Sequence, residues 1–240
     1  MSLKKLASLG LGWSLALLAH ASGLQVAPTS LTLPATQNAD GLWLSNTGDA
    51  VVHAQVRVFK WTQDKDGDQL TPSREVLVSP PMIELAASDR QLIRVIRTGA
   101  PPADAEATYR VVIDELPVAA GPDKGVQFVL RYSVPVFMAP AGAVAPQLDW
   151  KMVREGSQAV LEVGNSGSMH AQLADLKFTN AQGKSTDVHP GLLGYVLPGA
   201  KRRWPLKTPP NTFGGGGGSM DALINGSATQ QTLPPIEPAR

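Results

Sequence analysis

Hydrophobic and polar positions alternate with a period of two along most of the chain, as in β-strands that bury one face. In the segment 51–61, for example, Val52 and Val56 fall on one face and His53 and Arg57 on the other. On the same grounds, strands are expected at 24–33, 41–46, 51–61, 75–78, 91–97, 108–116 and 126–138. Seven short strands separated by turn residues are typical of an immunoglobulin-like sandwich.

A second, shorter series of strands follows a small apolar segment bounded by prolines at 139–146, which we interpret as a linker. The strands expected beyond it are 148–153, 159–163, 171–179, 194–197, 203–206 and 220–225. The proline-rich tail from 233 to 240 is expected to fray. We therefore predict an all-β protein with two immunoglobulin-like β-sandwich domains, at 22–140 and 146–240.

The first 21 residues have the three parts of a secretory signal peptide. Lys4 and Lys5 precede an apolar run at 6–18, and Ala19-His20-Ala21 supplies a small-x-small cleavage site. A buried N-terminal helix is the alternative, but it does not explain why all three parts occur in order. No later apolar run approaches the roughly 20 residues of a membrane-spanning helix. The mature protein is therefore predicted to be exported to the periplasm.

Charge and cysteine content narrow the classes of partner and of fold. Removal of the signal peptide leaves 19 basic and 20 acidic residues, which gives no electrostatic reason to expect nucleic acid or an anionic membrane as partner. The chain has no cysteine. An exported protein without disulfides needs a full-size hydrophobic core, which favours domains of about a hundred residues.

One acidic segment has part of the spacing of a calcium loop. Asp64, Asp66, Asp68 and Glu75 fall at positions 1, 3, 5 and 12 of such a loop, but Gln69 stands where the required glycine would be. The flanking segments are also patterned as strands rather than helices. We interpret the segment as an acidic hairpin turn.

Nothing in the sequence predicts an enzyme, a metal site or a cofactor. The three histidines after the signal peptide have no metal-ligand spacing, no Gly-x-Ser-x-Gly segment occurs, and cysteine nucleophiles are excluded. The five glycines at 214–218 are not followed by the Gly-Lys-Ser/Thr of a phosphate loop.

The segment 126–138 is the most unusual strand of the chain. Every even position from Val126 to Val136 is large and apolar, and Val129 and Pro135 make the opposite face partly apolar as well. Such a strand fits as the last strand of the first sandwich. A strand that is apolar on both faces and lies at an edge also invites pairing with another chain.

Five segments carry a resemblance to a known family. They are Arg57–Gln63 (RVFKWTQ), Ser79–Leu85 (SPPMIEL), Gln91–Val95 (QLIRV), Tyr109–Pro117 (YRVVIDELP) and the strand 126–138. In this order they resemble the N-terminal domain of PapD-like periplasmic pilus-assembly chaperones, and most of all the archaic branch associated with spore-coat-U-type pilins. Residues 146–240 match the shorter second domain of such proteins only loosely.

The resemblance implies two domains in a boomerang arrangement and a mechanism called donor-strand complementation. A pilin subunit lacks its last strand, and a chaperone strand fills the resulting groove. The donor residues here would be Val126, Phe128, Leu130 and Tyr132. The implied partners are pilin subunits and an outer-membrane usher, without a cofactor, and the free chaperone would self-associate to cover its exposed strand.

Members of the family also hold the subunit's C-terminal carboxylate with two basic residues, and here the sequence departs from the pattern. Ser30 occupies the early position and Pro135 the position in the donor strand. Arg94 and Arg131 are the nearest candidates by pattern, because a guanidinium binds a carboxylate with two hydrogen bonds. Structural pairing of these arginines with Glu106 or Asp114 is the alternative.

Two other functions share the predicted fold. A pilin or adhesin would be a single incomplete domain, whereas this chain has a full strand set and a second domain. An exported β-sandwich binding module, for instance for carbohydrate, would present an aromatic platform, and the chain has few aromatic residues. The sequence leaves open whether Pro80 or Pro81 follows a cis peptide bond.

Overall fold

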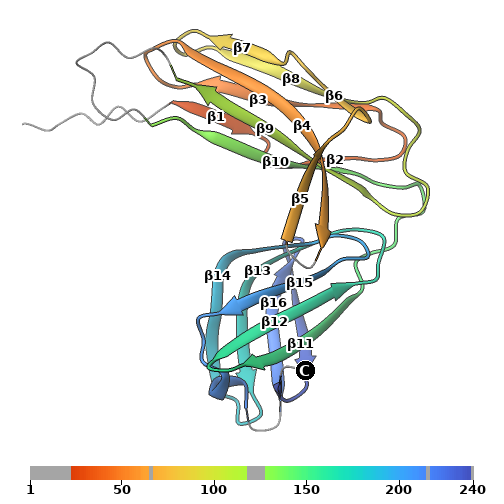
Figure 1. Cartoon of the computed structure of the whole chain (residues 1–240), viewed down its shortest axis with the longest axis vertical. Coiled ribbons are helices and arrows are strands. Elements are labelled where there is room, and N and C mark those ends of the chain that lie inside the picture. Colours follow the sequence, from red (N-terminus) through yellow and green to blue (C-terminus); the bar gives the residue numbers. More distant parts are fainter. Residues whose placement is uncertain (1–22, 65–66, 118–127, 215–216, 239–240) are drawn as a thin grey trace, which may run out of the picture.

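The computed structural model describes residues 23–64, 67–117, 128–214 and 217–238. The predicted signal peptide at 1–21 and the donor candidate Val126 lie outside these residues. The described chain forms two β-sandwiches, one from each half of the sequence, that meet at an angle (Figure 1). No helix in the described part of the chain is long and apolar enough to span a bilayer.

The first sandwich consists of two sheets. One sheet has the order β1 (Leu24–Ala27), β3 (Ala39–Asn46), β8 (Arg90–Arg97) and β6 (Val76–Ser79). The other has the order β2 (Leu31–Leu33), β10 (Arg131–Met138), β9 (Ala107–Leu116), β4 (Val52–Asp64) and β5 (Gly67–Pro72), and β7 (Met82–Leu85) also pairs with β4. All of these pairs are antiparallel except β10 with β2, which is parallel.

The single strand predicted at 24–33 is wrong in one respect, because the chain changes sheets within it. Residues 28–30 interrupt it, so that β1 pairs with β3 in one sheet and β2 with β10 in the other. The Ala27–Pro28 and Ser79–Pro80 peptide bonds are cis, which answers for Pro80 the question that the sequence left open. Strands β5 and β7 were not predicted, because β5 is mostly exposed and β7 has only four residues.

Alternation along the strands fills the core between these two sheets. Leu42 and Leu44 of β3, Ile93 and Val95 of β8, and Val111 of β9 are buried, while their neighbours in sequence face outward. Burying such side chains contributes about 1.5–3 kcal/mol each, which explains how a chain without disulfides keeps this domain folded.

In the described chain, the second sandwich also consists of two sheets, and each has four strands. One sheet has the order β15 (Lys201–Leu206), β12 (Gln158–Asn165), β11 (Leu148–Glu155) and β18 (Glu237–Pro238). The other has the order β14 (Ser185–Val196), β13 (Ala171–Asn180), β16 (Gly218–Ile224) and β17 (Ser227–Leu233), and a short 3-10 helix covers Pro210–Phe213. The tail predicted to fray instead adds Glu237 and Pro238 to the sheet, beside β11.

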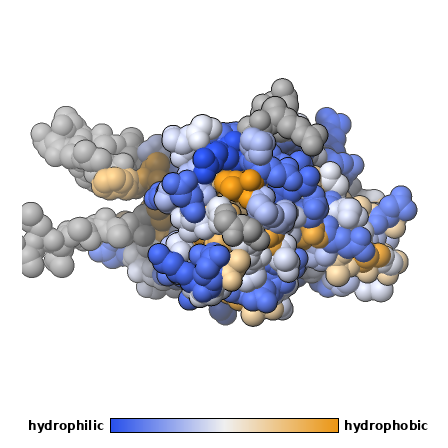
Figure 2. Space-filling view, turned by 90° about the horizontal axis from the view of Figure 1, so that it is seen from below, coloured by the Kyte–Doolittle hydropathy of each residue, from blue (hydrophilic) through white to orange (hydrophobic). Residues whose placement is uncertain are grey.

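The lower face of the second sandwich is mainly polar. Seen from below in the orientation of Figure 1, hydrophilic side chains dominate and apolar ones form small groups (Figure 2). The apolar side chains of this sandwich are instead gathered inside it, around Leu161, Leu173 and Phe178.

The junction between the sandwiches has a small core of its own. Trp61 of β4, Phe137 of β10 and Leu197 are buried together there, and Tyr195 packs against them. The side chain of Gln63 bridges the domains, donating to the carbonyl of Tyr195 (3.0 Å) and accepting from the backbone N–H of Leu197 (2.9 Å). These contacts fix the position of β14 relative to β4 and so shape the space between the domains.

A buried carboxylate–imidazole contact crosses the same junction. The carboxylate of Glu106, fully buried, has one oxygen 2.7 Å from Nδ1 of His170 and 3.0 Å from the backbone nitrogen of that residue. The imidazole is stacked on the ring of Phe137 with 3.5 Å between centroids. His170 therefore joins the second sandwich to two residues of the first, Glu106 just before β9 and Phe137 of β10.

Candidate functional site

Among the described residues, one edge of strand β10 is open over most of its length. The strand pairs with β9 from Arg131 to Met138, but with β2 only from Val136 to Met138. Pro135 has no N–H, so Pro135 and Arg110 form a non-hydrogen-bonded pair of the antiparallel ladder. In such a pair the main-chain groups of β10 point away from β9. The main-chain groups of Arg131 and Ser133 point the same way, since the direction repeats every two residues. They form an edge to which another strand can be added.

The apolar face of this strand continues into the residues that precede it in the sequence. Tyr132 and Leu130 pack partly buried against the core of the first sandwich, and the Tyr132 hydroxyl donates to the carbonyl of Leu24. Phe128 lies before the first residue of β10, which begins at Arg131 rather than at 126 as predicted, and the residue is 80% exposed. The rest of the described chain therefore covers this aromatic side chain only slightly, and exposed apolar groups of this kind mark contact surfaces.

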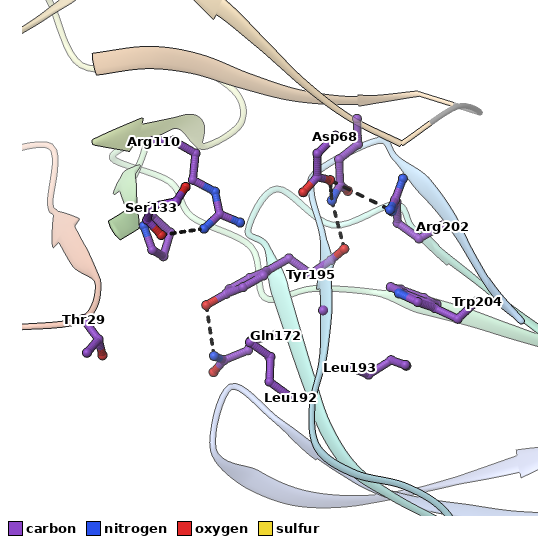
Figure 3. Close-up of a pocket in the computed structure, with 13 residues that line it drawn as sticks. Thr29, Asp68, Arg110, Ser133, Gln172, Leu192, Leu193, Tyr195, Arg202 and Trp204 are labelled. Atoms are coloured by element: carbon purple, nitrogen blue, oxygen red, sulfur yellow. Dashed lines mark hydrogen bonds and ion pairs between the residues drawn. The ribbon is translucent and has the colours of Figure 1, made fainter. Parts of the chain in front are cut away.

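The open edge leads into a cleft between the two sandwiches. The cleft has a volume of about 440 Å³, and Figure 3 shows the residues that line it. Thr29, Asp68, Arg110, Ser133 and Pro135 line it from the first sandwich, together with Gln63. The second sandwich contributes Gln172, Leu192, Leu193, Gly194, Tyr195, Arg202 and Trp204.

Arg110 is the cation that the first sandwich contributes to the lining of the cleft. It lies on β9 directly opposite Pro135, and its guanidinium donates to the carbonyl of Ser133 (3.2 Å). The guanidinium carbon lies 3.7 Å from the ring centroid of Trp61 and 5.5 Å from that of Tyr195. Burial among these rings lowers the pKa of Arg110, although an arginine remains charged at neutral pH. Its contacts are a carbonyl and two aromatic rings, and the carboxylate of Asp68 acts on it only through space. An incoming carboxylate would therefore add the charge-assisted hydrogen bond that none of these groups gives it.

A second arginine enters the cleft from the other domain. Arg202 of β15 lies 3.9 Å from Asp68 of the β4–β5 hairpin, and its Nε is buried without a hydrogen-bond partner in the described structure. Both sides of the cleft therefore carry a guanidinium. This arrangement attracts an anionic group such as a carboxylate.

The family comparison agrees with this geometry. The family model of the pili and flagellar-assembly chaperones, PapD N-terminal domain, matches residues 23–144, which is just over half of the chain. The chain belongs to this family.

Solved structures extend the likeness of this chaperone over both domains. A chain of the chaperone–tip adhesin complex of CsuC and CsuE, from archaic Csu pili of Acinetobacter baumannii, is 23% identical with a TM-score of 0.68, covering 90% of this chain and 99% of that one. A chain of the complex between SafA pilin and the SafB chaperone of Salmonella enterica is 20% identical with a TM-score of 0.64, at 90% and 98% coverage. The E. coli chaperone DraB is 20% identical with a TM-score of 0.59, at 88% and 98% coverage. At these identities the likeness shows a shared fold. No curated protein matches the sequence.

The chaperone does not bring the two predicted anchor arginines into the cleft. Arg94 of β8 is exposed on the outer face of the other sheet, beside Gly41 and Ser79, because Ile93 and Val95 take the core positions. Arg131 is exposed and pairs with Asp114, directly across on β9. That pairing is one of the two structural alternatives considered from the sequence, and it places Arg131 about 13 Å along the strand from Pro135.

The residues that do form the cleft were missed for an identifiable reason. Arg110 is separated by 25 positions from Pro135 in the sequence, and only the register of β9 against β10 places the two side by side. Aligning the two predicted strands as an antiparallel pair would have placed Arg110 opposite Pro135. Arg202 and Trp204 have no such signal, since their position depends on how the second sandwich docks. Ser30 is exposed and outside the strands, while its neighbour Thr29 lines the cleft.

Proposed function

We propose that this chaperone binds pilin subunits by donor-strand complementation and delivers them to an outer-membrane usher. The observation that carries the proposal is the open edge of β10, continued by the exposed side chain of Phe128. An unpaired edge with an apolar extension is what an incomplete sandwich requires in order to complete its sheet.

Main-chain and side-chain contacts would contribute to subunit binding in different ways. Main-chain groups of β10 give affinity with little dependence on sequence, and the alternate side chains Val126, Phe128 and Leu130 enter the groove of the subunit. Tyr132, also predicted as a donor residue, already packs on its own domain and is expected to contribute less. Each apolar side chain that becomes fully buried contributes about 1.5–3 kcal/mol, so a few of them can dominate binding.

Arg110 takes the place of the missing basic residues in this proposal. A subunit strand paired with the open edge reaches the cleft at Ser133 and Pro135, where its terminal carboxylate would meet the Arg110 guanidinium. Because the cleft lies toward the C-terminal end of β10, a strand that ends there runs parallel to β10. The terminal carboxylate then fixes the register of the added strand, which main-chain hydrogen bonds alone leave free.

The proposed location is the periplasm, reached through the predicted signal peptide at 1–21. The same open edge also supports self-association of the free chaperone, in which a second copy covers Phe128. Subunit and second copy would compete for the edge.

The test is co-expression of the chaperone with its cognate pilin, followed by purification of the complex. Wild type is expected to yield a one-to-one complex, and Arg110→Gln to weaken it roughly tenfold or more, as expected when one charge-assisted contact is lost. Arg94→Gln is the matched control, since Arg94 is exposed outside the cleft. A failure of wild type to capture any pilin would refute the proposed function, and an effect of Arg94→Gln equal to that of Arg110→Gln would refute the assigned anchor.

A further inference from the structure

The second sandwich contributes the large aliphatic side chains and an indole to the lining of the cleft, beside the polar Gln172 and Arg202. Leu192 and Leu193 of β14 and Trp204 of β15 line the same space as Arg110 and Arg202 (Figure 3). Leu192 is 53% exposed, although it lies inside a strand. We refer to Leu192, Leu193 and Trp204 as the apolar shelf.

A local irregularity of β14 builds this shelf. Leu173 of β13 pairs with Gly194 and the next residue, Ala174, pairs with Leu192, so Leu193 is an extra residue in a β-bulge. Successive side chains of a regular strand point to opposite faces, but a bulge re-aims one of them. Both leucines therefore line the cleft.

Gly194 completes the shelf by leaving room for the indole. Its φ of 152° is one that other residues rarely adopt, and a Cβ at this position would lie 3.3 Å from the ring of Trp204. A residue without a side chain therefore lets Trp204 lie against the strand.

We propose that the apolar shelf binds a large apolar side chain at the C-terminal residue of the bound subunit, so that the second domain selects subunits by their last residue. The inference rests on the proposed function, because it needs a chain end in the cleft. Three observations favour this occupant. The open edge leads a strand to Ser133 and Pro135, Arg110 supplies the charge that a terminal carboxylate needs, and the shelf lines the same cavity.

The size of the cavity fits this occupant. A volume of about 440 Å³ is in the range that holds small ligands, and it accommodates a carboxylate together with one aromatic side chain. Placing the side chain on the shelf would cover Leu192. Such a contact gives discrimination on the order of tenfold between large and small side chains.

The test uses fluorescent synthetic dodecapeptides of alternating valine and threonine, whose affinities are measured by anisotropy. One peptide ends in phenylalanine and another in alanine, both as free acids, and a third ends in phenylalanine as the C-terminal amide. Wild type is expected to bind the phenylalanine acid about tenfold more tightly than the alanine acid. In Leu192→Ser this ratio should fall below about threefold, while the preference for acid over amide persists.

Two further variants separate the inference from the proposed function. Arg110→Gln should lose the preference for acid over amide and keep the preference for phenylalanine. Leu77→Ser should change neither ratio, because Leu77 is similarly exposed, at 51%, but lies on the outer face of β6. If wild type bound the phenylalanine and alanine acids equally but still preferred acid to amide, only the role of the shelf would be refuted. An unchanged ratio of the two acids in Leu192→Ser would have the same meaning. If no peptide bound wild type, the proposed function and the shelf would both fail.

Discussion

Replacing Phe128 by aspartate is expected to abolish capture of the pilin subunit while leaving the chaperone folded. The side chain is 80% exposed and lies outside β10, so the substitution removes little from the core of the chaperone. In the complex, however, the aspartate would be buried in the apolar groove of the subunit, where an unpaired carboxylate is strongly unfavourable. Loss of the apolar contact and burial of a charge together lower the affinity by a factor of about a thousand or more.

The measurement is co-purification of the complex, together with the thermal unfolding of the isolated chaperone. Leu77→Asp is the matched control, since it places the same charge at an exposed leucine of another strand. Leu130→Asp should also prevent capture, but with some loss of stability, because Leu130 packs partly against the core. Survival of the complex in both donor variants would show that the donor strand is assigned to the wrong residues.

The second large effect is expected at the junction, where His170→Ala should destabilise the chaperone by about 3 kcal/mol. The substitution removes the only side-chain partner described for the buried carboxylate of Glu106, whose other oxygen already has none. Breaking a buried pair leaves an uncompensated charge, which costs more than the pair itself contributes. The stacking of the imidazole on Phe137 is lost as well.

Urea unfolding of the chaperone measures this effect. The double variant Glu106→Gln/His170→Ala should recover part of the loss, because a buried neutral amide is less unfavourable than a buried carboxylate. His53→Ala, at a partly exposed histidine of β4, serves as control. A change of less than about 0.5 kcal/mol in His170→Ala would contradict the role of the pair. Weaker binding of subunits is expected in parallel, since the junction shapes the cleft.

Local sequence determined much of this protein. Alternation along segments such as 91–97 and 108–116 predicts strands that the structure places within one or two residues. It does so because a strand that buries one face needs an apolar residue at every second position. The all-β class and the two sandwiches follow from such patterns, whereas the chaperone family was indicated by the resemblance of five short segments to known members. The apolar face continued by Phe128 could be recognised in the same way, because its signal is contained in one short segment.

Only the tertiary structure decided which charges lie at the cleft. Arg94 and Arg131 were candidates by pattern for the carboxylate anchor. In the structure, sheet pairing places Arg94 on the outer face, and Arg131 forms an ion pair with Asp114. Arg110 becomes the cleft cation through its register opposite Pro135, and the apolar shelf forms only because the second sandwich docks beside it. Periodicity reports which face of a strand is buried, whereas strand register and domain docking depend on contacts between residues far apart in the sequence.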